Sequence, residues 1–139
     1  MVLKLSVDLK NFINDYLSEM DIRWHWAISP KILHTSGETG AVDVDMFMSY
    51  IDGVYGTGCL KFVCNGSDAS WAEIERYVKE VIVYCNGAEI TVPDIWIMPV
   101  GATKEEQETV ADIVNESMRR GYKVATRNHA YVYGNVIGT

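Results

Sequence analysis

The N-terminal part of the chain has a helical spacing of apolar residues followed by a strand-like one. Over Leu9–Met20 apolar residues recur every three or four positions, which predicts an amphipathic helix with Asp8 as its N-cap. Over Ile22–Ile28 they alternate with polar or small residues, which predicts a strand. Ser29-Pro30 interrupts this alternation, so we expect the strand to end there.

Helical and strand-like patterns continue to alternate along the rest of the chain. Two of the helical patterns begin with capping-box sequences, Ser70-Trp-Ala-Glu73 and Thr103-Lys-Glu-Glu106. Asn86-Gly87 and Gly121 are typical of helix ends. In chain order we predict a loop from His34 to Gly40, a helix from Asp43 to Val54, a strand from Cys59 to Cys64, a helix from Ser70 to Gly87, a strand from Asp94 to Met98, a helix from Thr103 to Gly121 and a strand from Tyr122 to Thr126.

This order of elements predicts the class of fold. Strands that alternate with helices indicate a parallel sheet whose strands are joined by crossover helices. We therefore predict an α/β fold with a parallel sheet of about four strands. Residues 1–139 are interpreted as a single domain, in which residues 1–21 form an N-terminal helix and residues 22–139 form the strand–helix units.

Composition and charge narrow the function classes. The chain has 139 residues, 48% of them hydrophobic, which is enough for one core. Its 12 Lys and Arg against 19 Asp and Glu give a net charge of −7, which disfavours binding to nucleic acids and to anionic membranes. We find no apolar run of the roughly 18 residues that a membrane span needs and no secretory signal pattern at residues 1–6. The expected location is the cytoplasm.

The cysteines are three in number and widely spaced: Cys59, Cys64 and Cys85. An odd count with such spacing predicts reduced core thiols rather than a disulfide framework. It also differs from the short spacing of zinc and iron–sulfur loops, so we predict no metal site within this chain.

Polar residues follow the predicted strands. The carboxyl ends of parallel strands share one edge of a sheet, where ligands bind, so we expect the loops after the strands to form one rim. Their hydroxyl, amine, amide, guanidinium and imidazole groups suit a small polar or anionic ligand. The four loops are Ser29-Pro30-Lys31, Asn65-Gly66-Ser67, Pro99-Val100-Gly101 and Arg127-Asn128-His129.

These loop residues also have structural interpretations. Lys31 fits a solvated surface lysine, and Arg127 and His129 fit a pair that secures the end of a strand. The sequence contains no phosphate-binding glycine loop, no HExxH and no GxSxG. The residue pattern by itself therefore indicates a polar rim on a small α/β domain, and it does not identify a reaction.

Four segments carry a family resemblance, and together they cover most of the chain from Trp24 to Thr139. In this order and spacing they resemble the C-terminal half of 7-carboxy-7-deazaguanine synthase, a radical S-adenosylmethionine enzyme of the queuosine and deazapurine pathway. The segments are Trp26-Ala-Ile-Ser-Pro-Lys31, Leu60-Lys-Phe-Val-Cys-Asn-Gly66, Ile95-Trp-Ile-Met-Pro99 and Thr126-Arg-Asn-His-Ala-Tyr-Val-Tyr-Gly-Asn-Val-Ile-Gly-Thr139.

The resemblance implies the later part of a partial (β/α) barrel, with the active site at its carboxyl edge. It implies the rearrangement of 6-carboxy-tetrahydropterin to 7-carboxy-7-deazaguanine, with S-adenosylmethionine, a 4Fe–4S cluster and magnesium (Mg2+) as cofactors. By matching motif, Ser29 and Lys31 would contact S-adenosylmethionine, and Asn65, Met98 and Pro99 would line the cofactor side. Arg127, His129 and the C-terminal carboxylate of Thr139 would face the pterin.

The chain departs from the family in the parts that hold the cluster. The family's CxxxCxxC loop is missing, as are its glycine-rich loop and its magnesium-binding residue, and Asn128 stands where an apolar residue is usual. We therefore expect that this chain binds neither the cluster nor magnesium and is inactive alone. It would be the second polypeptide of a split enzyme, a truncated remnant, or a scaffold repurposed for another ligand.

These three explanations imply different partners. A split enzyme needs a cluster-bearing N-terminal polypeptide, whereas self-association would instead cover the open sheet edge. The alternative from another class is a non-catalytic purine- or pterin-binding or interaction protein on the same scaffold.

Overall fold

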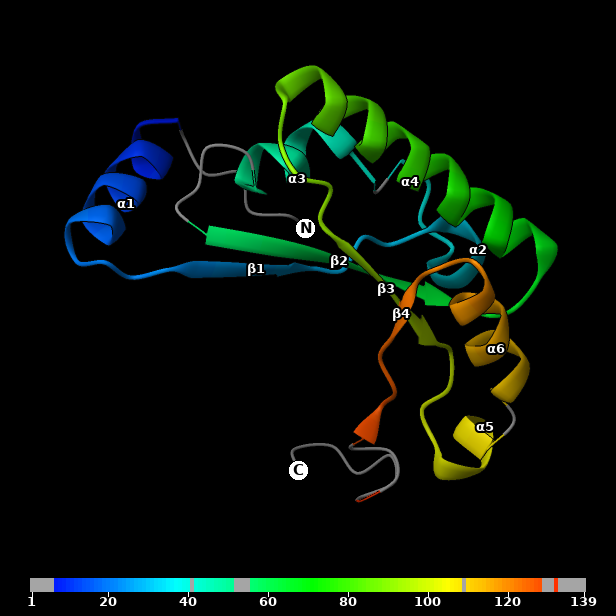
Figure 1. The fold of residues 1–139 in the computed structure, drawn as a ribbon. Coiled ribbons are helices and arrows are strands. Elements are labelled where there is room, and N and C mark those ends of the chain that lie inside the picture. The colour runs from blue at the N-terminus through cyan, green and yellow to red at the C-terminus, as the bar shows by residue number, and fades with distance from the viewer. Residues whose placement is uncertain (1–6, 41, 52–55, 109, 129–131, 133–139) are drawn as a thin grey trace.

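Helices and strands alternate along the chain as the sequence pattern predicts (Figure 1). The computed structural model describes residues 7–40, 42–51, 56–108, 110–128 and 132. Its elements are α1 (Val7–Glu19), β1 (Trp24–Ile28), α2 (Leu33–Ser36), α3 (Val44–Ile51), β2 (Gly56–Cys64), α4 (Asp68–Ala88), β3 (Asp94–Pro99), α5 (Lys104–Glu108), α6 (Ala111–Arg119) and β4 (Lys123–Val124).

The strands form one parallel sheet in the order β1-β2-β3-β4. Its register places Ile28 beside Leu60, Leu60 beside Ile95, and Ile97 beside Val124. The predicted α/β fold with a four-stranded parallel sheet is confirmed. The last strand is shorter than predicted, because only Lys123–Val124 pairs with β3.

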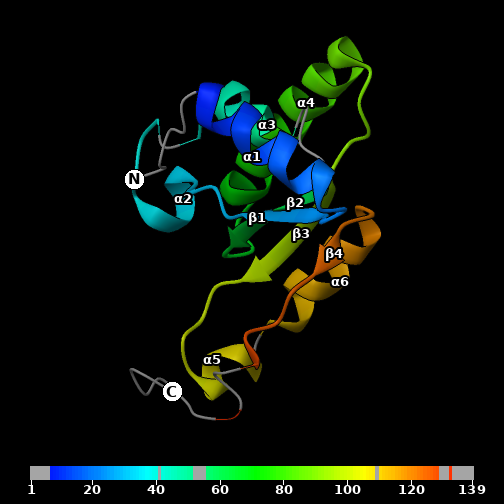
Figure 2. The ribbon, with the colours of Figure 1, turned by 90° about the vertical axis from the view of Figure 1, so that its left-hand side faces the viewer.

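One face of the sheet carries the core. Leu60 and Phe62 of β2 and Ile97 of β3 are fully buried, in one cluster with Ile74 and Val81 of α4. Side chains of α3 and α6 complete the same cluster. In Figures 1 and 2, α2, α3 and α4 lie together on one side of the strands, and α6 runs beside β4. Successive residues of a strand point to opposite faces, so the residues between the core-facing ones form the other face of the sheet.

That other face, which we call the open face, carries exposed or half-buried side chains. Only Cys59 among its described residues is buried. Its described residues are His25 and Ala27 of β1, Thr57, Cys59, Lys61 and Val63 of β2, Asp94, Trp96 and Met98 of β3, and Lys123 of β4.

Helix α1 forms as predicted but leaves most of its apolar stripe exposed. It begins at Val7, so Asp8 lies in its first turn and is not its N-cap. Of the stripe, Leu17 is buried, whereas Phe12 and Tyr16 stack on each other and remain 66% and 53% exposed. The periodicity therefore predicts the helix correctly but not its burial. None of the described helices is long and apolar enough to cross a bilayer.

The capping box predicted at Ser70 is wrong. The N-cap of α4 is Ser67, whose hydroxyl accepts a hydrogen bond from the backbone N–H of Ser70. Asn65 fixes this start, because its side-chain oxygen accepts bonds from both the backbone N–H and the hydroxyl of Ser67. Ser70 itself is fully buried inside the helix and donates to the Cys64 sulfur.

Glu73 caps a different helix. Its carboxylate accepts hydrogen bonds from the backbone N–H groups of Leu33 and His34, at 2.9 and 3.1 Å, and lies 2.7 Å from His34 Nδ1. These two N–H groups begin α2, which occupies part of the segment predicted as a loop. The glutamate thus joins α4 to α2 across about forty residues of sequence.

Helix α4 also ends later than predicted. It continues through Asn86 and Gly87 to Ala88, and Glu89 follows with a left-handed φ of 55°. Cys85 is fully buried and Ile90 packs against the core, so the helix continues far enough to bring Ile90 there.

The helix predicted from Thr103 to Gly121 consists of two helices. The capping box at its start is confirmed, because the Thr103 hydroxyl accepts from Glu106 N–H and the Glu106 carboxylate accepts from Thr103 N–H. This box opens the short α5, and Val110 precedes α6 as its N-cap. At the end of α6, Gly121 adopts a φ of 79°, as predicted for a glycine that terminates a helix.

Candidate functional site

The carboxyl edge of the sheet holds a hollow of about 500 Å³, which we call the edge hollow. It brings Asn65, which follows β2, together with the loop after β3 and with Arg127, which lies beyond β4. Three of the four predicted rim loops therefore contribute to one hollow. Its lining residues are Asn65, Val100, Gly101, Ala102, Glu106, Val110, Ile113 and Arg127.

Arg127 supplies the positive charge of the edge hollow. Its side chain is half buried, and its Nε atom is buried with no hydrogen-bond partner within the described ranges. A buried donor without a partner carries a desolvation cost that a bound anion would relieve. The guanidinium is therefore suited to a carboxylate or a phosphate, with which it forms charge-assisted hydrogen bonds.

Glu106 faces the same hollow but is held by the backbone. Its carboxylate accepts hydrogen bonds from the N–H groups of Ala102 and Thr103, at 2.6 and 3.1 Å. These bonds, and to a lesser extent the charge of Arg127, hold the pKa of Glu106 below its ordinary value although burial opposes them. Sequence reasoning placed Glu106 only at a helix start, and the structure also places it in the lining of the edge hollow.

The wall of the edge hollow depends on close packing at Gly101. This glycine has a φ of 135°, and a Cβ built on it would lie 2.7 Å from Gln107 Nε2. Gln107 is buried and donates to the carbonyl groups of Val100 and Gly101, at 3.4 and 3.1 Å. Gln107 of α5 therefore holds the loop after β3 against that helix on this side of the hollow.

Asn65 has a structural role in addition to its place in the hollow. Its Nδ2 donates to the carbonyl oxygen of His34 at 2.9 Å, while its Oδ1 accepts from Ser67. The amide therefore holds α2 and the start of α4 together at the carboxyl edge.

Ser29 and Lys31 line a second hollow, of about 430 Å³, beside the end of β1. The Ser29 hydroxyl donates to the carbonyl oxygen of Lys61 at 3.1 Å, and Lys31 is exposed. The predicted rim is thus divided into two hollows on one edge. Nothing in the described part of the chain tests whether either of these residues binds S-adenosylmethionine.

The remaining predicted site residues lie elsewhere. Pro99 is buried in the core-side row of β3, and Met98 is half buried on the open face, so neither lines the two hollows at the carboxyl edge. His129 and Thr139 lie outside the described residues.

The three thiols do not fit a shared iron–sulfur cluster. Cys59 and Cys64 are five residues apart in β2, so they point to opposite faces and their Cα atoms are separated by about 16 Å. Cys85 lies near the end of α4, and all three are buried. Burial also raises the pKa of the Cys59 thiol. Among the described residues no group of three His, Cys, Asp or Glu side chains is arranged to hold a metal ion.

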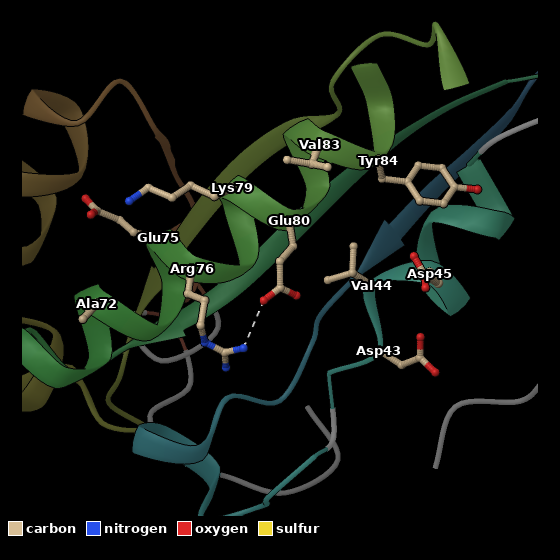
Figure 3. A pocket seen from close by; sticks show the side chains of 10 residues that line it. All are labelled: Asp43, Val44, Asp45, Ala72, Glu75, Arg76, Lys79, Glu80, Val83 and Tyr84. Carbon is tan, nitrogen blue, oxygen red and sulfur yellow. Dashed lines mark hydrogen bonds and ion pairs between the residues drawn. The ribbon is translucent and has the colours of Figure 1, made fainter. Parts of the chain in front are cut away.

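A larger hollow, of about 740 Å³, lies on the outer side of the helical layer between the start of α3 and α4 (Figure 3). An Arg76–Glu80 ion pair crosses part of it, at 3.1 Å. The carboxylates of Asp43 and Asp45 stand opposite at the start of α3, where Asp43 accepts from the backbone N–H of Met46. Arg76, Glu80 and Asp43 are thus engaged by neighbouring protein groups, so this hollow is a weaker candidate than the edge hollow.

Comparisons with protein-family models, with curated proteins and with solved structures found no match to this chain.

Proposed function

We propose that this chain is the C-terminal part of a 7-carboxy-7-deazaguanine synthase-like radical S-adenosylmethionine enzyme that acts with a separate, cluster-bearing polypeptide. The resemblance of four segments motivates the proposal. Its reaction would be the rearrangement of 6-carboxy-tetrahydropterin to 7-carboxy-7-deazaguanine.

The observation that carries the proposal is that the helices of the core cover one face of the sheet and leave the other open. The core and its helices α3, α4 and α6 occupy one face, and the described side chains of the open face are exposed or half buried except for Cys59. Sequential parallel strands with helices on one face are the arrangement of a (β/α) barrel segment. Within the described residues β1 pairs only with β2, so its outer edge is available to a further strand.

The edge hollow supplies a site for the acidic substrate. The Arg127 guanidinium would bind the substrate carboxylate, because charge-assisted hydrogen bonds to a partly buried arginine favour a planar anion. Ser29 and Lys31 would hold S-adenosylmethionine in the second hollow, where an amine and a hydroxyl are available. Because its thiols do not converge, this chain would leave the cluster, and with it the reductive chemistry, to the partner polypeptide.

Co-expression tests the proposal. The chain is expressed with a polypeptide that carries a CxxxCxxC loop, and the two are purified without oxygen. We expect a stable brown complex that cleaves S-adenosylmethionine, whereas the chain alone gains no cluster absorption after iron–sulfide reconstitution. Separate elution of the two polypeptides, with no cleavage product, would contradict the split enzyme.

A matched pair of arginine variants tests the role of the edge hollow. In the active complex, Arg127→Gln should raise KM for 6-carboxy-tetrahydropterin about tenfold or more, because a charge-assisted contact is lost. Arg76→Gln, which removes an exposed arginine on α4, should leave KM unchanged. Equal KM values for the two variants would remove Arg127 from the substrate site.

A second candidate is a non-catalytic protein that binds a purine or pterin. It is favoured by the edge hollow being formed within this chain, with the unpartnered Arg127 Nε. Calorimetry on the lone chain and co-expression together separate the two functions: binding of pterin-6-carboxylate that is lost in Arg127→Ala, with no complex and no cleavage of S-adenosylmethionine, favours the binding protein. Sedimentation of the lone chain as a dimer would favour self-association over a separate partner polypeptide.

A further inference from the structure

The open face carries a row of three side chains from neighbouring strands. Lys61 of β2 lies beside Trp96 of β3 in the sheet register, and Trp96 lies beside Lys123 of β4. Paired residues of parallel strands point to the same face, so an indole ring stands between two amines. None of these residues lines the edge hollow or the hollow beside β1.

The two lysines differ in what they contact. Lys123 Nζ lies 5.6 Å from the centre of the Trp96 ring and forms an ion pair with Asp94. The structure records no ion pair for Lys61 within the described ranges, although its side chain is half buried. Both amines act electrostatically on Cys59, which places their charges on the same part of the open face.

This group is positive in an acidic chain. Two lysines against the single carboxylate of Asp94 leave one net positive charge there, while the chain as a whole carries −7. The side chain of Lys61 is half buried and forms no ion pair with a carboxylate among the described residues, so its charge is available to a bound anion. The indole ring beside it is also half buried and offers a flat surface for stacking.

We propose that the open face binds a small planar heteroaromatic anion, with its ring against Trp96 and its anionic group at Lys61. Lys123 is held by Asp94 and flanks the ring on the other side. This site goes beyond the proposed function, because it uses other residues and needs no cluster-bearing partner. A nucleic acid is disfavoured as the occupant, since two lysines cannot offset the repulsion between its backbone and an acidic chain.

Calorimetry on the lone chain tests the site with two probes, adenosine 5′-monophosphate and nicotinate. Adenosine is the uncharged control ligand. We expect saturable binding of at least one anion and weaker binding of adenosine. Lys61→Gln should weaken binding of the anion about tenfold, because a contact to a charged group is lost, and should leave adenosine unchanged. Trp96→Leu should weaken all ligands that bind.

Three controls make the result decisive. Lys79→Gln removes an exposed lysine on α4 and should bind the probes as the unsubstituted chain does. Arg127→Gln removes the anion-binding group of the edge hollow, so the binding that remains in this variant is assigned to the open face. Thermal unfolding of each variant shows whether it is folded, and Trp96→Phe keeps a ring if Trp96→Leu does not fold.

Two results would overturn the proposal. One is the absence of saturable binding by either anion. The other is anion binding that both Lys61→Gln and Trp96→Leu leave unchanged. Binding that is lost only in Arg127→Gln would assign the ligand to the edge hollow instead, and it would leave the second candidate function standing.

Discussion

At the scale of single residues, Glu73 shows that a capping-box sequence can identify a capping residue correctly and yet assign it to the wrong helix. The Ser70-to-Glu73 spacing predicts that the glutamate caps its own helix. Instead, Asn65 and Ser67 start that helix three residues earlier, which leaves the Glu73 carboxylate free to cap α2. Such a contact depends on which helices become neighbours in space, and local spacing does not contain that information.

Removing this cap should destabilise the fold. Glu73→Ala leaves the N–H groups of Leu33 and His34 without their acceptor in a partly buried position, which should cost about 1–3 kcal/mol in the free energy of unfolding. Urea unfolding measures it. Glu80→Ala, which removes an exposed glutamate paired with Arg76, is the matched control and should cost less than about 1 kcal/mol. Equal costs would show that the Glu73 contacts contribute nothing beyond those of an exposed pair.

The same contacts predict a dependence on pH. Burial raises the pKa of Glu73, but hydrogen bonds from the His34 ring and the two N–H groups outweigh it, so the pKa lies below its ordinary 4.5. A carboxyl with a lowered pKa stabilises the fold above its unfolded value, and this contribution is lost as pH falls through the folded value. The difference in stability between the unsubstituted chain and Glu73→Ala should therefore be constant near pH 7 and shrink below 4.5. A difference that stays constant down to pH 3 would contradict this origin.

At the scale of elements, the apolar period identifies the strands and most helices, because each buries a regular face. It fails where tertiary contacts decide the length of an element. Helix α4 continues one residue past Asn86-Gly87 to Ala88, with Cys85 in the core and Ile90 packed against it. The apolar pattern also does not predict which residues at the end of a strand line a hollow. Met98 and Pro99 adjoin a rim loop, yet their side chains point to opposite faces of the sheet.

The sequence already shows two rows of open-face residues, one in β2 and one in β3. Lys61 and Val63 alternate with buried Phe62, and Trp96 and Met98 alternate with buried Ile97. This period of two already separates an inner row from an outer row in each strand. Which rows meet depends on the sheet register, so the Lys61–Trp96–Lys123 group appears only in the structure.

Helix α1 offers a test of burial at the level of an element. Leu17 is 6% exposed, so Leu17→Ala should lower the free energy of unfolding by about 2 kcal/mol or more. Phe12 is 66% exposed, so Phe12→Ala should change it by less than about 0.5 kcal/mol. Chemical unfolding of the two variants compares them directly. A large loss in Phe12→Ala would mean that the exposed stripe is covered in solution.

At the scale of the whole molecule, the core and its helices cover one face of the sheet, and the other is the open face. The described residues form a core of their own, and the helices of that core lie on the same side of the strands. This arrangement explains how the chain folds around its own hydrophobic cluster while keeping a sheet edge and an open face available. It also separates two sites, the edge hollow at Arg127 and the proposed anion site at Trp96.

We propose that another polypeptide continues the sheet beyond β1. Amide hydrogen exchange over Trp24–Ile28 tests it most directly, in the lone chain and in the co-expressed complex with the cluster-bearing polypeptide. A strand added to the outer edge would bond the amides that now face away from β2, so their exchange should slow about tenfold or more in the complex. Exchange at the same rate in the complex and in the lone chain would contradict the account.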